Sequence, residues 1–288
     1  MENINVPKLI GYFLAALGIL YAVALLVSAV RRKEEFKNEK GNLLFLGLAE
    51  AIIYFFGTIG MSDFTLNTLV IRQQKLMDDK TLPGTLITAA LVPGSVIAFF
   101  LLQVENNVDL VTLLPCCVAI TTGSVLGSRL VGKIEGRKIR KLMGFAMIFS
   151  MAAIILRMIL DRGTSGTLNG LVFPKLAIAV VFCFFWGGVN MLGVPMKAAA
   201  SAMFLLLGVS PLSTLTLVLV IGCIGPMGGG ISIIREKRYH QKLCCASVVC
   251  GSLGAAVGSL LAIAVSPLVL NILLLAVLAI AIYTMLRN

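Results

Sequence analysis

Long runs of apolar residues, separated by short polar and basic stretches, dominate the chain. A helix needs about 20 residues to cross the roughly 30 Å hydrocarbon core of a bilayer. Apolar runs of about this length predict spanning helices at residues 9–30, 82–103, 110–132, 140–160, 211–233, 243–264 and 268–286. The pattern therefore indicates an all-α polytopic membrane protein.

Two further apolar stretches, 42–77 and 171–208, are too long for one span and contain helix breakers near their middle. The first is interrupted at residues 57–63, and the second at residues 187–190 and 193–195. Glycine and proline gather at both places because a break in a helix needs permissive backbone. We predict that each stretch is a broken helical hairpin, and we favour the re-entrant over the fully crossing form.

Basic residues orient these segments. Most of the 24 lysines and arginines lie in the loops 31–40, 72–80, 133–141 and 235–242, whereas the loops 103–109, 208–213 and 265–270 have none. By the positive-inside rule the first set is cytoplasmic, which puts the N-terminus outside and the C-terminus inside the cell. The two hairpins then enter from opposite faces. The same rule explains the net charge of +11, so we expect no nucleic-acid partner.

A faint internal duplication fits this arrangement. The residues Gly60, Pro83, Thr88, Val92 and Gly94 recur in the same order as Gly188, Pro211, Thr216, Val220 and Gly222. A glycine-containing run at 123–128 recurs at 254–259. Two copies of opposite orientation form an inverted-topology repeat, a transporter plan with the substrate site near the midplane. We expect an N-terminal helix and basic loop at 1–40, a first repeat at 41–160 and a second at 161–288.

Composition supports a multi-pass protein of the cell (inner or cytoplasmic) membrane. The chain is 59% hydrophobic and 13% charged, with a mean hydropathy of +1.00, whereas soluble domains are about one quarter charged.

The lone histidine, His240, lies in a basic loop and is expected to be solvated. With no Ser–His pair, metal-binding spacing or Walker loop, we predict neither an enzyme nor a cofactor or metal site. The seven cysteines are expected to be apolar packing residues.

Several motifs carry a resemblance to a known family. They are Ile59-Gly60-Met61-Ser62, Leu82-Pro83-Gly84-Thr85, the glycine run 123–128, the basic start at 139–145, residues 188–195, and Pro211-Leu212-Ser213-Thr214. Over residues 42–286 the chain resembles the sulfite exporter TauE/SafE family, also called the 4-toluenesulfonate uptake permease family. The resemblance implies a transporter of small sulfur-containing anions or organosulfonates. This chain departs from the family's glycine runs at residues 61–63 and 189–191.

The two breaks are the first candidate site. A helix that starts at a midplane break presents free N–H groups and the positive end of its dipole, which suits an anion. The expected lining is Gly60, Met61, Ser62, Gly188, Val189 and Asn190. Hydroxyls of the next helix starts, at Thr85, Thr88, Ser213, Thr214 and Thr216, are further candidates. The alternatives are that the breaks serve only helix packing and that the hydroxyls serve only helix starts.

Three charged residues stand inside apolar segments, where charge is costly. Lys197 follows the second break and is expected either to attract an anionic substrate or to reach a wet cavity or an acidic partner. Glu50 and Asp63 are candidates for proton coupling, or alternatively fixed counter-charges to Lys197 or Arg129.

These features predict a secondary transporter that exposes a midplane site alternately to the two sides. The expected cargo is sulfite, thiosulfate or an organosulfonate. The alternative is an ion-coupled permease for a neutral or cationic metabolite, favoured by the two acids. Expected partners are the small anion and membrane lipids, with a homodimer left open.

Overall fold

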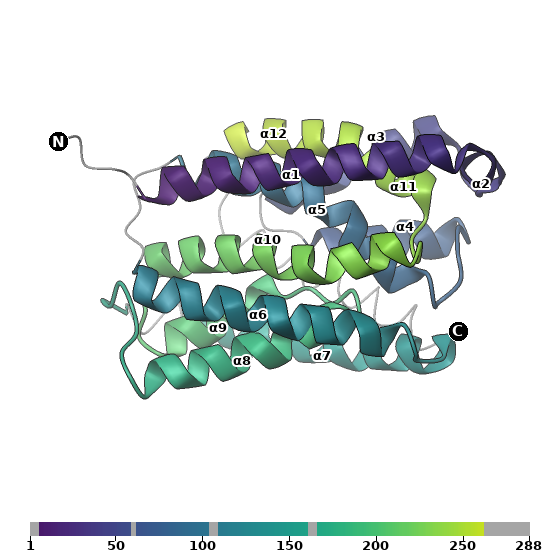
Figure 1. Cartoon of the computed structure of the whole chain (residues 1–288). Helices are drawn as coiled ribbons and strands as arrows, with labels where there is room; N and C mark the ends of the chain where they lie inside the picture. Colours follow the sequence, from purple (N-terminus) through teal and green to yellow (C-terminus); the bar gives the residue numbers. More distant parts are fainter. Residues whose placement is uncertain (1–5, 59–61, 104–108, 161–165, 262–288) are drawn as a thin grey trace.

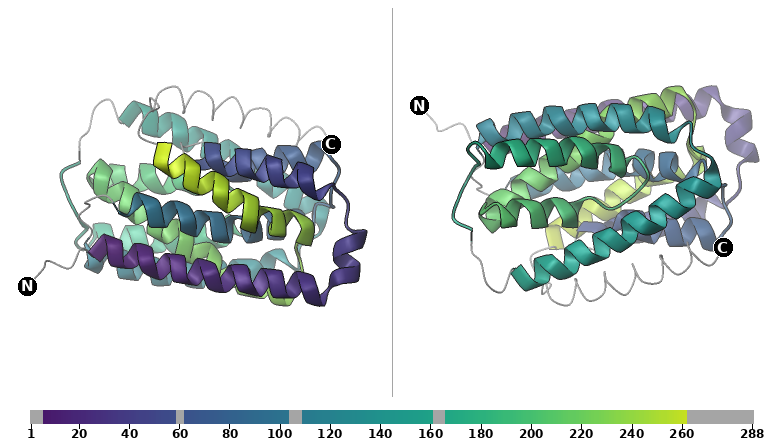
Figure 2. Two further views of the ribbon diagram at one scale, coloured as in Figure 1. Left: turned by 90° about the horizontal axis from the view of Figure 1, so that it is seen from above. Right: turned by 90° about the horizontal axis from the view of Figure 1, so that it is seen from below.

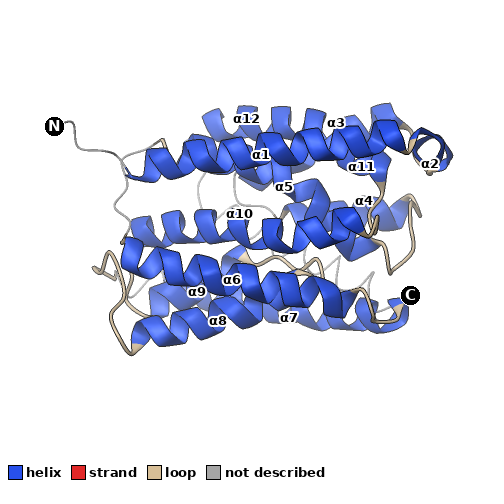
Figure 3. Cartoon of the chain, viewed as in Figure 1, coloured by secondary structure: helices blue, strands red, loops and turns tan. Residues whose placement is uncertain are grey.

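The computed structural model describes residues 6–58, 62–103, 109–160 and 166–261, and every element in these residues is a helix (Figure 3). In chain order the elements are α1 (Val6–Arg31), α2 (Lys33–Asn38), α3 (Leu43–Thr58), α4 (Asp63–Gln73), α5 (Leu82–Leu101), α6 (Leu110–Val131), α7 (Gly136–Leu160), α8 (Lys175–Asn190), α9 (Lys197–Leu206), α10 (Pro211–Arg235), α11 (Gln241–Ala246), the π-turn η1 (Ser247–Gly251) and α12 (Ser252–Leu261).

The predicted all-helical membrane architecture is confirmed. Among the described residues, α1, α5, α6, α10 and the composite helix Gln241–Leu261 are long and apolar enough to span a membrane. The predicted helix at 140–160 is present as α7. The short helix α2, within the basic loop 31–40, was not predicted. The predicted span 268–286 lies outside the described residues.

Both long apolar stretches are broken, as predicted. In the first, α3 ends at Thr58 and α4 begins at Asp63. In the second, α8 continues to Asn190 and α9 begins at Lys197. Figure 1 shows that the α3–α4 hairpin enters from one end of the bundle and the α8–α9 hairpin from the other.

The predicted position of the second break was partly wrong, because Gly187 and Gly188 lie inside α8. Gly187 is needed for close packing against α6, and Gly188 lies where Gly127 of α6 comes closest to α8. A Cβ atom on Gly187 would lie 3.0 Å from the Ser124 backbone nitrogen, and a Cβ on Gly127 would lie 2.5 Å from the Gly188 Cα. The chain turns after them, where Gly193 has a φ of +78° that favours glycine.

The helices form two layers with α10 between them. Seen from below, the lower layer runs in the order α6, α8, α9, α7; seen from above, the upper layer runs α3, α12, α5, α1 (Figure 2). Helix α10 contacts α6 in one layer and α5 in the other. The α5–α10 contact, called the seam below, therefore joins the two layers.

Each hairpin is held by a glycine-bearing helix from the other half of the sequence. Gly123 and Gly127 of α6 face α8, while Gly254 and Gly258 of α12 face α3. Small residues four apart let two helices approach closely in a membrane. This reciprocal packing of each half against the hairpin of the other supports the predicted inverted repeat. The repeat and its boundaries at residues 40 and 160 stay a prediction.

The four basic loops lie together at the right-hand end of Figure 1. We call this the basic end. Lysines and arginines near a membrane surface favour the cytoplasmic side, so the basic end is the one that we predict to face the cytoplasm.

Candidate functional site

The first hairpin tip is polar and capped. Ser62 occupies the N-cap position of α4, and its Oγ accepts a hydrogen bond from the Thr65 backbone N–H at 3.3 Å. Asp63 is the first helical residue and is 9% exposed. Its negative charge lies at the positive end of the α4 dipole, which stabilises it. The predicted site residues Gly60 and Met61 lie outside the described residues.

At the second hairpin tip the second helix begins with a lysine and has no side-chain cap. Asn190 closes the turn by donating from Nδ2 to the Val194 carbonyl at 2.9 Å, while Gly188 and Val189 belong to the last turn of α8. Helix α9 begins at Lys197, and Met196 at its N-cap position provides no side-chain cap. Lys197 is exposed although residues 199–205 behind it are all buried. The lysine therefore faces accessible space at the start of an enclosed helix.

The seam between the layers is open at its centre. The Cys223 thiol of α10 donates to the Gly94 carbonyl of α5 at 3.2 Å. A Cβ atom on Gly222 would meet nothing within 4 Å, and one on Gly94 would meet only the Cys223 sulfur at 4.0 Å. All three residues are half-buried near the middle of their helices. The expectation that every cysteine is a packing residue therefore misses Cys223, which borders this open space.

Each hairpin contacts one side of the seam, because α9 packs against α10 and α4 against α5. Lys197 from the second hairpin and Asp63 from the first both act electrostatically on the Cys223 thiol. A cation and an anion thus lie within electrostatic range of the place where Gly94 and Gly222 leave space between the layers. We call these residues the central site: Asp63, Gly94, Lys197, Gly222 and Cys223. Sequence reasoning missed Gly94, Gly222 and Cys223 as site residues, although the two glycines are equivalent positions of the internal repeat.

Glu50 is a buried acid near the middle of α3. It is 1% exposed, and its Oε2 has no hydrogen-bond partner among the described residues. The polar groups beside its carboxyl are Ser247, Asn67 and Asp63, and not the predicted counter-charges Lys197 and Arg129. Arg129 is exposed in the last turn of α6.

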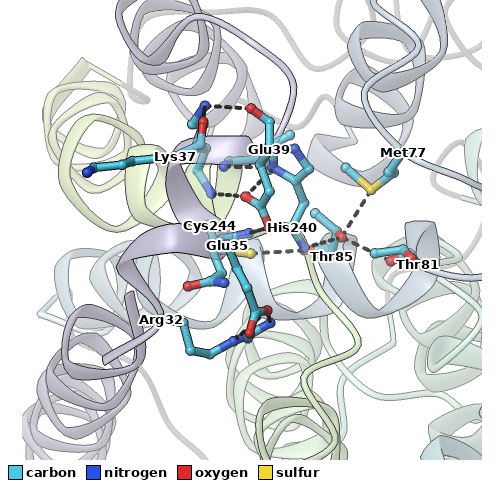
Figure 4. Close-up of polar contacts among 12 residues, drawn as sticks. Arg32, Glu35, Lys37, Glu39, Met77, Thr81, Thr85, His240 and Cys244 are labelled. Carbon is cyan, nitrogen blue, oxygen red and sulfur yellow. Dashed lines mark hydrogen bonds and ion pairs between the residues drawn. The ribbon is translucent and has the colours of Figure 1, made fainter. Parts of the chain in front are cut away.

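The candidate hydroxyls spread along α5 and α10, and some lie at the ends of the bundle. The Thr85 Oγ1 accepts from the His240 backbone N–H and donates to the Thr81 carbonyl, both at 3.0 Å (Figure 4). Ser213 hydrogen-bonds to Asn169 at 3.3 Å, and Thr216 bonds within its own helix. Thr88 and Thr214 are buried, and neither Oγ1 has a partner among the described residues.

His240 is buried, so the expectation of a solvated loop residue was wrong. It is 4% exposed and caps α11, where its Nδ1 accepts from the Leu243 backbone N–H at 3.2 Å. Glu39 accepts from the next two backbone N–H groups and lies 3.3 Å from Nδ1 (Figure 4). Burial lowers the pKa of His240 despite the nearby Glu39 carboxylate. The basic charge of the loop gave no signal of this capping role.

A comparison with known families identifies the chain. The family model described as sulfite exporter TauE/SafE matches residues 4–154, which is just over half of the chain. The chain belongs to the sulfite exporter TauE/SafE family. The matched part includes the first hairpin, α5 and α6, and so carries one side of the central site. The corresponding comparisons with curated proteins and with solved structures give no match.

Membership of the TauE/SafE family makes this chain a multi-pass membrane transporter, in agreement with the prediction from its apolar pattern. TauE/SafE proteins are transporters and not enzymes, which is consistent with the prediction of a non-enzyme. Within the four described stretches, no group of three His, Cys, Asp or Glu side chains is placed to hold a metal ion.

Proposed function

We propose that the protein is a secondary transporter for small sulfur oxyanions, with sulfite as the first substrate to test. The substrate binds at the central site, and the two layers expose it alternately to the two sides of the cell membrane. The basic end faces the cytoplasm. Ion or substrate gradients drive the cycle, because the sequence has no nucleotide-binding loop.

The observation that carries this proposal is the start of α9. Its first backbone N–H groups have no side-chain cap, and its first residue is the exposed Lys197. Uncapped N–H groups and the positive helix end together attract anions, and the lysine adds a full positive charge. We place the approaching anion at the open space beside Gly222, because α9 packs against α10.

The first tip suits this role less well. Ser62 already caps α4, and Asp63 brings a negative charge to the same point. The anion is therefore held by the second hairpin, and the first hairpin supplies the opposite wall. Of the predicted lining, we assign Asn190 and Lys197 to the substrate-binding part, and Ser62 and Asp63 to the opposite hairpin.

The test is sulfite binding to the purified protein by calorimetry, compared between wild type and Lys197→Met. A charged hydrogen bond contributes about 1.5–3 kcal/mol, so we expect the affinity to fall by about tenfold or more. The matched control is Lys175→Met, because Lys175 starts the other arm of the same hairpin and donates to the Leu207 carbonyl at 2.8 Å. Equal sulfite affinity in the wild type and Lys197→Met would refute the site.

A second candidate function is a permease for a neutral or cationic metabolite. The observation in its favour is Asp63, which places a carboxylate at the first tip. Binding measurements with taurine, a neutral sugar and an organic ammonium ion, alongside sulfite and thiosulfate, separate the two. Binding of the cation that is lost in Asp63→Asn, with no binding of the anions, would favour this second function.

A further inference from the structure

Glu50 is the buried acid that the anion site does not use. It lies near the middle of α3 and is 1% exposed, and among the described residues Asp63 is the charged group that acts on it electrostatically. An ionised carboxylate with no cation nearby is strongly unfavourable in an apolar interior. The negative charge of Asp63 makes ionisation of Glu50 more costly still. A proton on Glu50 removes this cost.

The hydrogen bonds around Glu50 also call for a proton. A serine hydroxyl has one hydrogen, and that of Ser247 is donated to the Ala89 carbonyl at 2.7 Å. Ser247 therefore presents a lone pair to Glu50. The Oδ1 of Asn67 and the Oε2 of Glu50 are also buried acceptors without a partner in the described part of the chain. The Asn67 amide can donate to one carboxyl oxygen of Glu50, and a proton on the other, Oε2, gives the unpartnered acceptors beside it a donor.

The π-turn η1, between α11 and α12, shapes the side of the pocket that faces Glu50. Ser247 begins the π-turn η1, whose last residue, Gly251, packs on the ring of Tyr54, one helical turn along α3 from Glu50. A Cβ atom on Gly251 would lie 2.8 Å from the Tyr54 Cδ2. Single π-turns within α-helices occur frequently at functional sites. Here the turn places the Ser247 hydroxyl beside Glu50.

Asp63 does not share this situation. It is the first residue of α4, next to the capping Ser62, so the helix dipole stabilises its negative charge. Of the two predicted coupling residues, only Glu50 is left without such compensation. The titratable groups that face Glu50 from the surrounding elements are Asp63 at the start of α4, Tyr54 on α3 and Cys244 on α11.

We propose that Glu50 is the proton-binding residue of the transport cycle and that its protonation holds the α4 arm in place. This inference rests on the proposed transport function and assigns its coupling ion. The proton is carried on the Glu50 carboxyl, is released to water when the pocket opens, and is regained from water on the other side. Asn67 and Asp63 both lie on α4, so a change of charge at Glu50 acts on the arm that forms the first tip.

The test uses the purified full chain in proteoliposomes, with sulfite as the probe and a pH-sensitive dye inside the vesicles. Glu50→Gln mimics the protonated acid. We expect it to retain exchange of labelled sulfite and to lose both sulfite-dependent proton movement and uptake driven by a pH gradient. Glu35→Gln is the control, because it removes the same charge from an exposed position on α2. Proton movement that persists in Glu50→Gln would overturn the proposal.

Infrared spectroscopy provides a readout that needs no substrate. At neutral pH the wild type should show the carbonyl stretch of a protonated carboxylic acid, which Glu50→Gln should lack and Asp63→Asn should retain. A spectrum without this band in the wild type, or with it in Glu50→Gln, would contradict a protonated Glu50. If wild-type vesicles do not move sulfite but the band behaves as expected, the sulfite proposal fails and the proton site stands.

Discussion

The close packing of α6 on α8 makes a sharp prediction for Gly123→Ala. A Cβ atom on Gly123 would lie 2.9 Å from the Phe184 carbonyl carbon and 3.2 Å from its Cα, and closer still to the carbonyl oxygen. These are backbone atoms of a neighbouring helix, so no side-chain rotation relieves the overlap. The two helices must move apart along their contact.

The expected cost follows from this geometry. Adding a methyl group to a well-packed contact costs about 1–3 kcal/mol. For a protein of this size that corresponds to a fall in Tm of about 2–10 °C. Gly254→Ala should behave alike, because its Cβ would lie 2.7 Å from the Ala51 carbonyl carbon on α3. The two substitutions test the two hairpin contacts separately.

The assay is thermal unfolding of the detergent-solubilised protein, followed by the loss of the monodisperse peak on gel filtration. Gly222→Ala is the matched control, because it makes the same chemical change within a helix but its methyl group meets nothing within 4 Å. Alanine also has the higher helix propensity, so this variant should be at least as stable as wild type. Equal Tm values for Gly123→Ala and Gly222→Ala would refute the packing argument.

Three further predictions concern the seam and the basic end. Gly222→Val should fill the open space and block sulfite exchange while Tm stays near the wild-type value; undiminished exchange would place the pathway elsewhere. Thr85→Val removes the acceptor of the His240 N–H and should cost about 1–3 kcal/mol with unchanged sulfite affinity; weaker binding in calorimetry would put Thr85 in the site. Because burial lowers the pKa of His240, the folded state binds its proton less readily than the unfolded chain does. Wild-type Tm should therefore fall as the pH drops through the ordinary value of 6.5, and His240→Asn, which keeps an N-cap acceptor, should reduce this slope.

The long apolar runs were sufficient to predict the five described helices that are long and apolar enough to span a membrane, and the two broken hairpins, because membrane burial imposes length and composition directly on a sequence. The sequence placed the second break only in part, because glycines have two different uses. Gly187 is small so that α8 can approach α6, whereas Gly193 provides a positive φ for the turn. Composition is the same in the two cases, and only the partner helix distinguishes them.

The candidate site was predicted in outline and missed in its centre. Charge within an apolar segment was enough to single out Glu50, Asp63 and Lys197, since such residues are costly and need a purpose. Nothing comparable in the sequence marks Gly94, Gly222 and Cys223. The open space between α5 and α10 forms only where small residues of the two helices come together in the fold. The repeat did mark the two glycines, as equivalent positions on α5 and α10. His240 was misjudged because the residues that enclose it, Glu39 and Thr85, are remote in sequence.

The two hairpins have matched packing but unlike chemistry, and this difference bears on mechanism. Gly123 packs against α8 and Gly254 against α3, the first helices of the two hairpins, in the same way. This scaffold is therefore compatible with two states in which the two halves of the chain exchange conformations. The tips break that equivalence, because α9 starts with an uncapped Lys197 and α4 with a capped Asp63. A site that was positive at both tips would bind an anion in either state and would have no built-in link to a proton. Lys197 belongs to the second hairpin and the buried Glu50 to the first, so the proposed anion binding and protonation would act on different hairpins, and a movement of one hairpin against the other can couple them.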